Sequence, residues 1–182
     1  NDVNSPSKMR LFNDLNHGYI AWSPVSMQFA LATTGDDMSD DFNADSYLHV
    51  YSITNGFSSL VEDFCLSFSA TFTCVAWTVD DVIVVGFDSG QVMMGGWNEL
   101  QSGTYLSAHG SPVTVLSAST GLEANVLASG SEKGEVSFWD PNRRELLYAA
   151  KNKVGTTPHS GKVTSINWNT KVPRICCTAS LD

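Results

Sequence analysis

The sequence predicts an all-β fold built from a repeated unit of short antiparallel strands. Three observations support this prediction. Four segments of the chain follow the same order of apolar runs and polar turns. The runs are short and mostly alternate apolar with polar residues, and none keeps the i, i+3, i+4 spacing of a helix. Hydrophobic residues make up 42% of the 182 residues, which is enough for a substantial core.

The repeated unit opens with an apolar run that ends near a tryptophan. Trp22, Trp77 and Trp168 end this run in the first, second and fourth units, and Ala118 takes their position in the third. Trp22 and Trp77 are 55 residues apart, and the 91 residues from Trp77 to Trp168 cover two units. The long first interval leaves room for a loop insertion. The runs predicted to be strands are 19–22, 29–35 and 47–51, then 72–77, 82–86 and 91–94, then 113–116, 126–131 and 135–139, and finally 163–168 and 175–180.

This period is typical of the WD40 β-propeller, whose blades have roughly 40–45 residues and four strands each. We therefore expect a polar lead-in at residues 1–16 and a partial WD40 β-propeller at residues 17–182. It would hold about four blades, the last truncated at Asp182. Because these blades do not complete a typical ring, three interpretations stay open. The chain is the N-terminal part of a larger propeller, a half-ring that a partner completes, or a piece of a ring.

Each turn has its own chemistry. Gly90 and Gly134 follow two polar residues between apolar runs, which is typical of a short hairpin that needs a positive φ at the glycine. Pro141 ends the third unit's last run because proline cannot donate a hydrogen bond to a sheet. We expect a turn at Arg143-Arg144, and another at Gly95-Gly96-Trp97 rather than a nucleotide-binding loop.

Two histidines stand before the first strands of the last two units. His109 and His159 occupy the Gly-His position of WD40 proteins, although Ala108 and Pro158 precede them here. In WD40 proteins this histidine commonly joins a buried hydrogen-bond network between strands. No acidic or cysteine partner stands near either histidine in the sequence, so we expect a structural role rather than catalysis or metal binding.

The Trp-Asp dipeptide that gives the repeat its name occurs literally once, at Trp139-Asp140. Tyr51-Ser52 and Met94-Gly95 take that position in the first two units, and the usual aspartate of the turn between the second and third strands is displaced or replaced by Lys133. We expect the residues at structural blade positions to be Trp22, Trp77, His109, Ser129, Trp139, Asp140, His159 and Trp168.

The charge balance disfavours some partners. Ten basic against nineteen acidic residues give a net charge of −9. Without a basic cluster, binding to nucleic acid or directly to an anionic membrane is not expected. The acidic residues at 36–45 suit a solvated insertion loop, with a docking surface for a basic partner as the alternative. They lack the alternation of a calcium loop.

The four cysteines lack C-x-x-C spacing. Cys74, Cys176 and Cys177 lie in apolar runs, which predicts buried, reduced thiols and a cytoplasmic protein. We expect no metal, no cofactor and no enzymatic activity, because no catalytic or phosphate-binding motif is present. The carboxylate pair Asp80-Asp81 falls where a blade needs a polar turn. An enzyme or ligand-binding propeller would need polar side chains converging on the central channel.

The order of motifs resembles one family. The motifs are the first blade's 19–23, the segment 42–52 that ends its long loop, and 72–77 with 85–90, followed by 125–130, 134–140 and 161–169. Together they are similar to the N-terminal propeller of the large outer-coat subunit of the COPII vesicle coat. The similarity extends over roughly residues 15–182.

This resemblance implies a seven-bladed ring in a structural scaffold subunit, which forms cage vertices during vesicle budding from the endoplasmic reticulum toward the Golgi. The implied partners are a small propeller subunit of the outer coat, further copies of the chain at the vertices, and inner-coat subunits contacted through downstream regions. The protein would be cytoplasmic, at endoplasmic reticulum exit sites and vesicles, and would meet membrane only indirectly. The alternative is a WD40 adaptor or scaffold of another complex, such as a ubiquitin ligase or a chromatin assembly.

Overall fold

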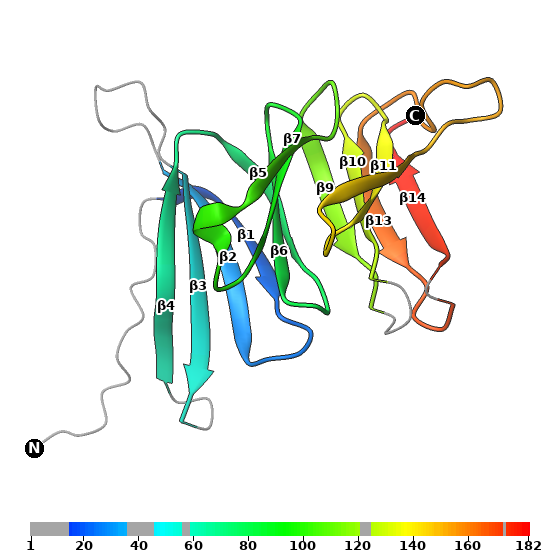
Figure 1. The fold of residues 1–182 in the computed structure, drawn as a ribbon. Coiled ribbons are helices and arrows are strands. Elements are labelled where there is room, and N and C mark those ends of the chain that lie inside the picture. Colours follow the sequence, from blue (N-terminus) through cyan, green and yellow to red (C-terminus); the bar gives the residue numbers. More distant parts are fainter. Residues whose placement is uncertain (1–14, 36–45, 56–58, 121–124, 173) are drawn as a thin grey trace, which may run out of the picture.

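The computed structural model describes residues 15–35, 46–55, 59–120, 125–172 and 174–182. Within these residues the chain forms three four-stranded antiparallel sheets and a two-stranded one. Each sheet consists of strands consecutive in sequence, and the sheets follow one another along the chain like the blades of a fan (Figure 1). The predicted all-β, partial WD40 β-propeller is confirmed.

The strand bounds follow the repeat. The first blade holds β1 (Leu15–Trp22), β2 (Gln28–Gly35), β3 (Ser46–Thr54) and β4 (Ser59–Phe68). The second holds β5 (Phe72–Trp77), β6 (Val82–Phe87), β7 (Gln91–Gly96) and β8 (Thr104–Ser107), with a short 3-10 helix η1 (Leu100–Ser102) before β8. The third holds β9 (Val113–Ala118), β10 (Leu127–Ser131), β11 (Val136–Asp140) and β12 (Glu145–Ala149), and the last sheet holds β13 (Val163–Trp168) and β14 (Cys176–Ser180).

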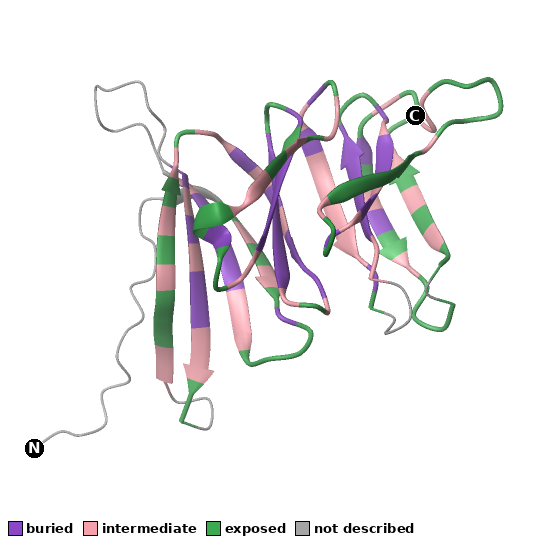
Figure 2. Cartoon of the chain, in the orientation of Figure 1, coloured by how far each residue is buried: buried purple, intermediate pink, exposed green. Residues whose placement is uncertain are grey.

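The three inner strands of each complete blade match the apolar runs of the sequence. The outermost strands β4, β8 and β12 do not stand out in the sequence because they contribute few buried residues. Every residue of β12 is exposed, whereas every residue of β6 is buried (Figure 2). A strand without a buried face loses the alternation that would reveal it.

The hydrophobic core lies between neighbouring blades rather than inside any one of them. Leu48 and Val50 of the first blade pack with Phe72 and Ile83 of the second. Two further clusters join the second blade to the third and the third to the last sheet. A sheet covered on both faces has apolar residues in succession, which explains the run at β6.

Glycine permits close contact at two of these interfaces. A β-carbon on Gly86 of β6 would lie 2.9 Å from Val113 Cγ1 of β9. A β-carbon on Gly130 of β10 would lie 2.7 Å from Val163 Cγ1 of β13. The same pair of residue types therefore joins the second blade to the third and the third to the fourth.

Two predicted hairpin turns are confirmed, and a third, predicted at Gly95-Gly96-Trp97, begins only at Trp97. Gly90 and Gly134 have φ values of +84° and +81°. In contrast, Gly95 and Gly96 belong to β7, and the chain turns only after them. Position 95 favours a glycine because Leu100 of η1 packs there. A β-carbon on Gly95 would lie 3.1 Å from Leu100 Cδ2.

Two predicted segments lie mostly or wholly outside the described residues. They are the lead-in at 1–16, of which only the last two residues belong to the described β1, and the acidic stretch at 36–45. In the described part of the chain, no helix has the length and apolar character of a membrane span.

Candidate functional site

A chain of buried polar groups crosses the third blade. His109 Nε2 lies 2.8 Å from Ser129 Oγ, and Trp139 Nε1 donates a 2.8 Å hydrogen bond to the same oxygen. Ser129 is fully buried in the middle of β10, and Trp139 lies on the adjacent β11. Since the indole can only donate, Ser129 Oγ accepts from it, and the serine proton can point to the imidazole at 2.8 Å or to the backbone oxygen of Ser137 at 3.5 Å. The network therefore joins β10 and β11 to the segment that precedes β9.

An acidic residue also approaches this histidine, contrary to expectation. Glu135 Oε2 lies 3.7 Å from His109 Nδ1, which is too far for a hydrogen bond, so this buried nitrogen has none. The carboxylate instead accepts from the hydroxyl of Ser131 at 2.8 Å and from the amide of Gly110 at 3.2 Å. Glu135 thus provides a carboxylate two residues after Lys133, which agrees with a displaced acid rather than a replaced one. The expectation that no acid stands near His109 is wrong.

Burial decides the protonation of His109. Desolvation lowers the pKa of the imidazole from its usual 6.5, and the nearby Glu135 opposes this only in part. His109 is therefore neutral at neutral pH. A neutral imidazole can accept the Ser129 proton at Nε2 while its Nδ1–H faces Glu135.

The last sheet repeats the arrangement. His159 Nε2 lies 2.8 Å from Thr178 Oγ1 of β14, and His159 Nδ1 lies 3.3 Å from Asp182. Asp182 also accepts a 2.9 Å hydrogen bond from the amide of Ser160. The acid comes from beyond β14, more than twenty residues from the histidine in sequence, so a search around His159 could not find it.

In the second blade apolar packing replaces this network. The pairing of β6 with β7 sets Ile83 opposite Gly95, as Leu127 is opposite Trp139 in the third blade. The position of the Trp-Asp dipeptide is therefore Gly95-Gly96, not Met94-Gly95. By the same register, Val85 stands where Ser129 stands, so no hydroxyl is available there.

The three repeat tryptophans occupy one register but different surroundings. Trp77 is 5% exposed and donates a hydrogen bond to Asp81 at 3.1 Å. Trp168 is half-buried and donates to the backbone oxygen of Ser117 in the neighbouring blade at 2.9 Å. Trp22 is 58% exposed and packs on Phe29 at 5.1 Å.

The carboxylates of Asp80 and Asp81 diverge instead of forming a pair. Asp81 accepts from Trp77 and, at 3.5 Å, from Ser23 of the first blade. Asp80 accepts from Asn125 and Asn142 of the third blade at 2.7 and 2.5 Å. This turn therefore links the second blade to both of its neighbours.

Asp140 also serves a turn. Its Oδ1 accepts 3.0 Å hydrogen bonds from the amides of Asn142 and Arg143, and its Oδ2 lies 3.7 Å from Arg143 Nε. Arg144 has a φ of 57° in the same turn. The turn predicted at Arg143-Arg144 is therefore confirmed.

The cysteines only partly follow expectation. All four are free thiols, and Cys74 is buried, which raises the pKa of its thiol to about 12. Cys176 is half-buried, and Cys177 is exposed, so the prediction that both are buried is wrong. β14 pairs only with β13 in this structure, and its side chains are not covered as those of an inner strand are.

The third blade has an exposed apolar outer strand. Leu146, Leu147 and Tyr148 of β12 are each at least 50% exposed. Leu147 is bulged out of the pairing, because Trp139 pairs with Leu146 and Phe138 with Tyr148. Consecutive exposed apolar side chains of this kind are characteristic of contact surfaces.

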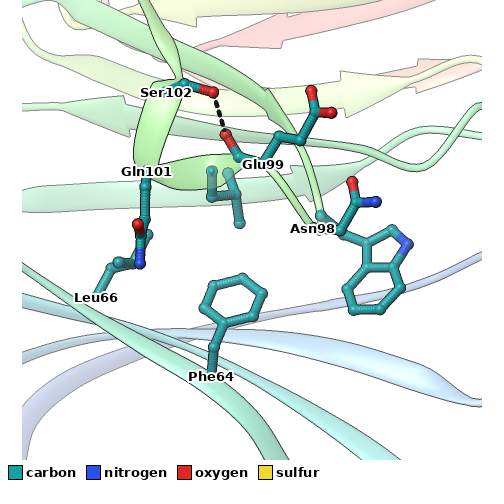
Figure 3. Close-up of a pocket in the computed structure, with 8 residues that line it drawn as sticks. Phe64, Leu66, Asn98, Glu99, Gln101 and Ser102 are labelled. Carbon is teal, nitrogen blue, oxygen red and sulfur yellow. Dashed lines mark hydrogen bonds between the residues drawn. The ribbon is translucent and has the colours of Figure 1, made fainter.

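A recess of about 420 Å³ opens between the first two blades, where β4 faces η1 (Figure 3). Phe64, Leu66 and Leu100 line its apolar part, while Asn98, Glu99 and Gln101 supply polar groups. Ser102 Oγ donates a 2.9 Å hydrogen bond to the backbone oxygen of Glu99, which fixes the 3-10 turn. Its lining has one carboxylate and no histidine or cysteine. The recess therefore suits binding of a side chain from another protein better than catalysis.

Comparison with known proteins agrees with this picture. No protein-family model matches the chain. The protein transport protein SEC31 of Kluyveromyces lactis is 26% identical over 77% of this chain and 11% of its own length. SEC31 of Dictyostelium discoideum is 26% identical over 88% of the chain and 14% of its length, and Sec31A of Homo sapiens is 23% identical over the same shares. The chain thus spans only about a seventh or less of these relatives.

Solved structures share the fold. A chain in the structure described as "COPII on membranes, outer coat vertex" superposes with a TM-score of 0.65 and 22% identity, over 90% of this chain and 46% of that one. The computationally designed Ika4 protein superposes with a TM-score of 0.58 and 20% identity, over 90% of this chain and 84% of its own. The chain is therefore a partial WD40 β-propeller similar to a region of the SEC31 protein transport proteins, as its motifs predict.

Proposed function

We propose that this chain is part of a structural scaffold subunit of the COPII outer coat, which forms cage vertices as vesicles bud from the endoplasmic reticulum toward the Golgi. The proposal is supported by sequence similarity to SEC31 proteins, at 23–26% identity, over 77–88% of the chain. The protein would act in the cytoplasm, at exit sites and on vesicles.

The geometry suits a scaffold. Its buried polar groups hold strands and blades together, as Ser129 and Asp81 do. Its exposed features are apolar and amide surfaces, on β12 and in the recess beside η1. A stiff body with such surfaces suits contact with other proteins better than turnover of a substrate.

Vertex assembly would depend on many weak contacts. A propeller that meets further copies at a vertex needs each contact to break easily, while their number holds the lattice. In this proposal the partners are a small propeller subunit of the outer coat, further copies of the chain, and inner-coat subunits reached through other regions. The net charge of −9 agrees with recruitment by proteins rather than by anionic lipid.

The test is affinity purification of the tagged full-length protein from gently lysed cells, with the partners identified by mass spectrometry. We expect the small propeller subunit in near-equal amount, followed by inner-coat components. Recovery of ubiquitin-ligase or chromatin subunits without any coat component would reject the coat role and leave only the propeller fold.

A further inference from the structure

Three side chains that can bind a metal meet on the outer hairpin of the first blade. His49 lies in β3, and Glu62 and Cys65 lie in β4. One donor atom from each, a ring nitrogen, a carboxylate oxygen and the thiol sulfur, lies within 4.8 Å of the other two. His49 Nδ1 is 2.6 Å from Glu62 Oε1. We refer to these three residues as the β3–β4 cluster.

The strand register explains why they meet. His49 pairs directly with Cys65, so both side chains lie on the same face of the sheet. The pairing then skips Asp63, and Glu62 pairs with Tyr51. Without this bulge, alternation would place Glu62 on the opposite face, against the second blade. The bulge therefore completes the cluster.

Neighbouring groups hold two of the three side chains in place. The imidazole of His49 lies between two tyrosine rings: it stacks with Tyr51 at a centroid distance of 5.9 Å, and Tyr47 is tilted against it at 6.1 Å. The hydroxyl of Tyr51 hydrogen-bonds to Glu62, and burial together with this carboxylate raises the pKa of Tyr51 to about 12. Outer partners of this kind orient the ligands of metal sites.

We propose that His49, Glu62 and Cys65 bind one zinc ion, with water in the fourth position. Nitrogen, oxygen and sulfur are the donors that zinc accepts. One carboxylate and one thiolate would balance its two positive charges. The His49 side chain is only 14% exposed, whereas Glu62 is 45% exposed and can move to admit the ion.

The required movement is small. Zinc–ligand distances of about 2.0–2.3 Å in a tetrahedral site set neighbouring donor atoms roughly 3.3–3.6 Å apart. If Nδ1 is the ligand, the His49–Glu62 contact must open by less than about 1 Å to reach that separation. The separations to the thiol, at most 4.8 Å, must close by no more than about 1.5 Å to reach the same range. Rotation of exposed side chains supplies both movements.

The same environment argues against the other use of a cysteine beside a histidine. A nucleophilic thiol needs a lowered pKa, but burial and the nearby Glu62 raise the pKa of Cys65. A divalent cation reverses this relation, because it displaces the thiol proton and is attracted by the carboxylate that otherwise opposes ionisation.

Cobalt(II), a spectroscopic substitute for zinc, tests the site in the purified full-length protein with a non-thiol reductant. We expect one equivalent to bind with a near-ultraviolet thiolate-to-cobalt absorption band, which one equivalent of zinc removes. Cys65→Ser should abolish the band and weaken binding at least tenfold, since even outer partners of metal ligands contribute about 10–100-fold. Glu62→Gln should weaken binding but keep the band.

Cys177→Ser is the matched control, because it removes another exposed thiol that lies in the last sheet. It should bind cobalt as the unaltered protein does, and circular dichroism would verify the fold of every variant. The proposal fails if the unaltered protein shows no saturable binding, if its cobalt complex lacks the thiolate band, or if Cys65→Ser retains that band. Any of these results would leave His49 and Glu62 as an ordinary ion pair.

Discussion

The hydroxyl of Ser129 is fully buried, with 2.8 Å hydrogen bonds to His109 and Trp139 and a longer one, 3.5 Å, to the backbone oxygen of Ser137. The Ser129→Ala substitution leaves the Trp139 indole N–H and the His109 imidazole without their partner. We expect it to lower the free energy of unfolding by about 1–3 kcal/mol, the usual cost of such orphaned groups. Urea unfolding followed by tryptophan fluorescence measures this loss.

Thr178→Ala is the matched comparison, because Thr178 bonds His159 as Ser129 bonds His109, but in a half-buried site that water can enter. Its loss should be the smaller of the two. An equal loss would show that burial of the network is not what stabilises the third blade.

The protonation of His109 gives stability a dependence on pH. Burial lowers the pKa of His109 in the folded chain, so below about pH 6.5 the unfolded chain binds a proton that the folded chain resists. The contribution is complete above pH 6.5 and is lost as the pH falls toward the lowered pKa. We therefore expect a lower urea midpoint at pH 5.5 than at pH 7.5.

His109→Gln should flatten this slope, since glutamine does not titrate. The lowered pKa of Asp182 also makes stability fall with acid, but only near and below the ordinary range of a carboxyl group, around 3.8. A slope between pH 7.5 and 5.5 that His109→Gln leaves unchanged would contradict this assignment.

At the scale of elements, the turn between β10 and β11 depends on one glycine. Gly134 has a φ of +81°, and a β-carbon there would fall on the carbonyl oxygen of His159. Gly155 has nearly the same φ, +84°, but nothing within 4 Å of that position. A residue with a side chain would therefore strain the backbone at both positions, but only at position 134 would its β-carbon also clash with a neighbouring group.

We expect Gly155→Ala to lower the free energy of unfolding by about 1 kcal/mol, the cost of a left-handed alanine. Gly134→Ala should exceed that by at least about 1 kcal/mol, because the backbone before β13 must also shift. Chemical denaturation of the two variants side by side measures the difference. Equal losses would mean that a β-carbon at position 134 does not clash with the backbone of His159.

The strands differ in how well the sequence predicts them. The inner strands were predictable because each buries apolar side chains against a neighbouring blade. β12 was not, because both of its faces are exposed. The acid beside His109 and the β3–β4 cluster were missed for another reason. Residues far apart in sequence meet there through turns, strand register and a bulge, which no local pattern encodes.

At the scale of the whole molecule, the exposed strand β12 is the surface that best tests the scaffold role. Leu147 is 51% exposed and bulged out of the sheet, so Leu147→Asp should leave stability nearly unchanged. If β12 contributes to contacts between copies, the aspartate should reduce them roughly fivefold, as loss of about 1 kcal/mol at an interface would. Co-isolation of two differently tagged full-length copies measures the effect.

Val154→Asp is the control, because Val154 is 82% exposed in the loop after β12 and gains the same charge. It should leave co-isolation unchanged. A similar reduction by both variants would attribute the effect to added charge and not to the apolar strand.

The two glycine–valine contacts also affect the angle between neighbouring blades. Val113 and Val163 lie so close to Gly86 and Gly130 that a β-carbon at either glycine would come within 2.9 Å of a valine methyl group. A ring divides one full rotation equally among its blades, so a wedge at one interface adds to the angular step there. Such errors accumulate around the circumference and emerge as a gap where the ring should shut. The absence of a side chain at Gly86 and Gly130 therefore limits how far the angle between neighbouring blades can vary before a ring of such blades fails to close.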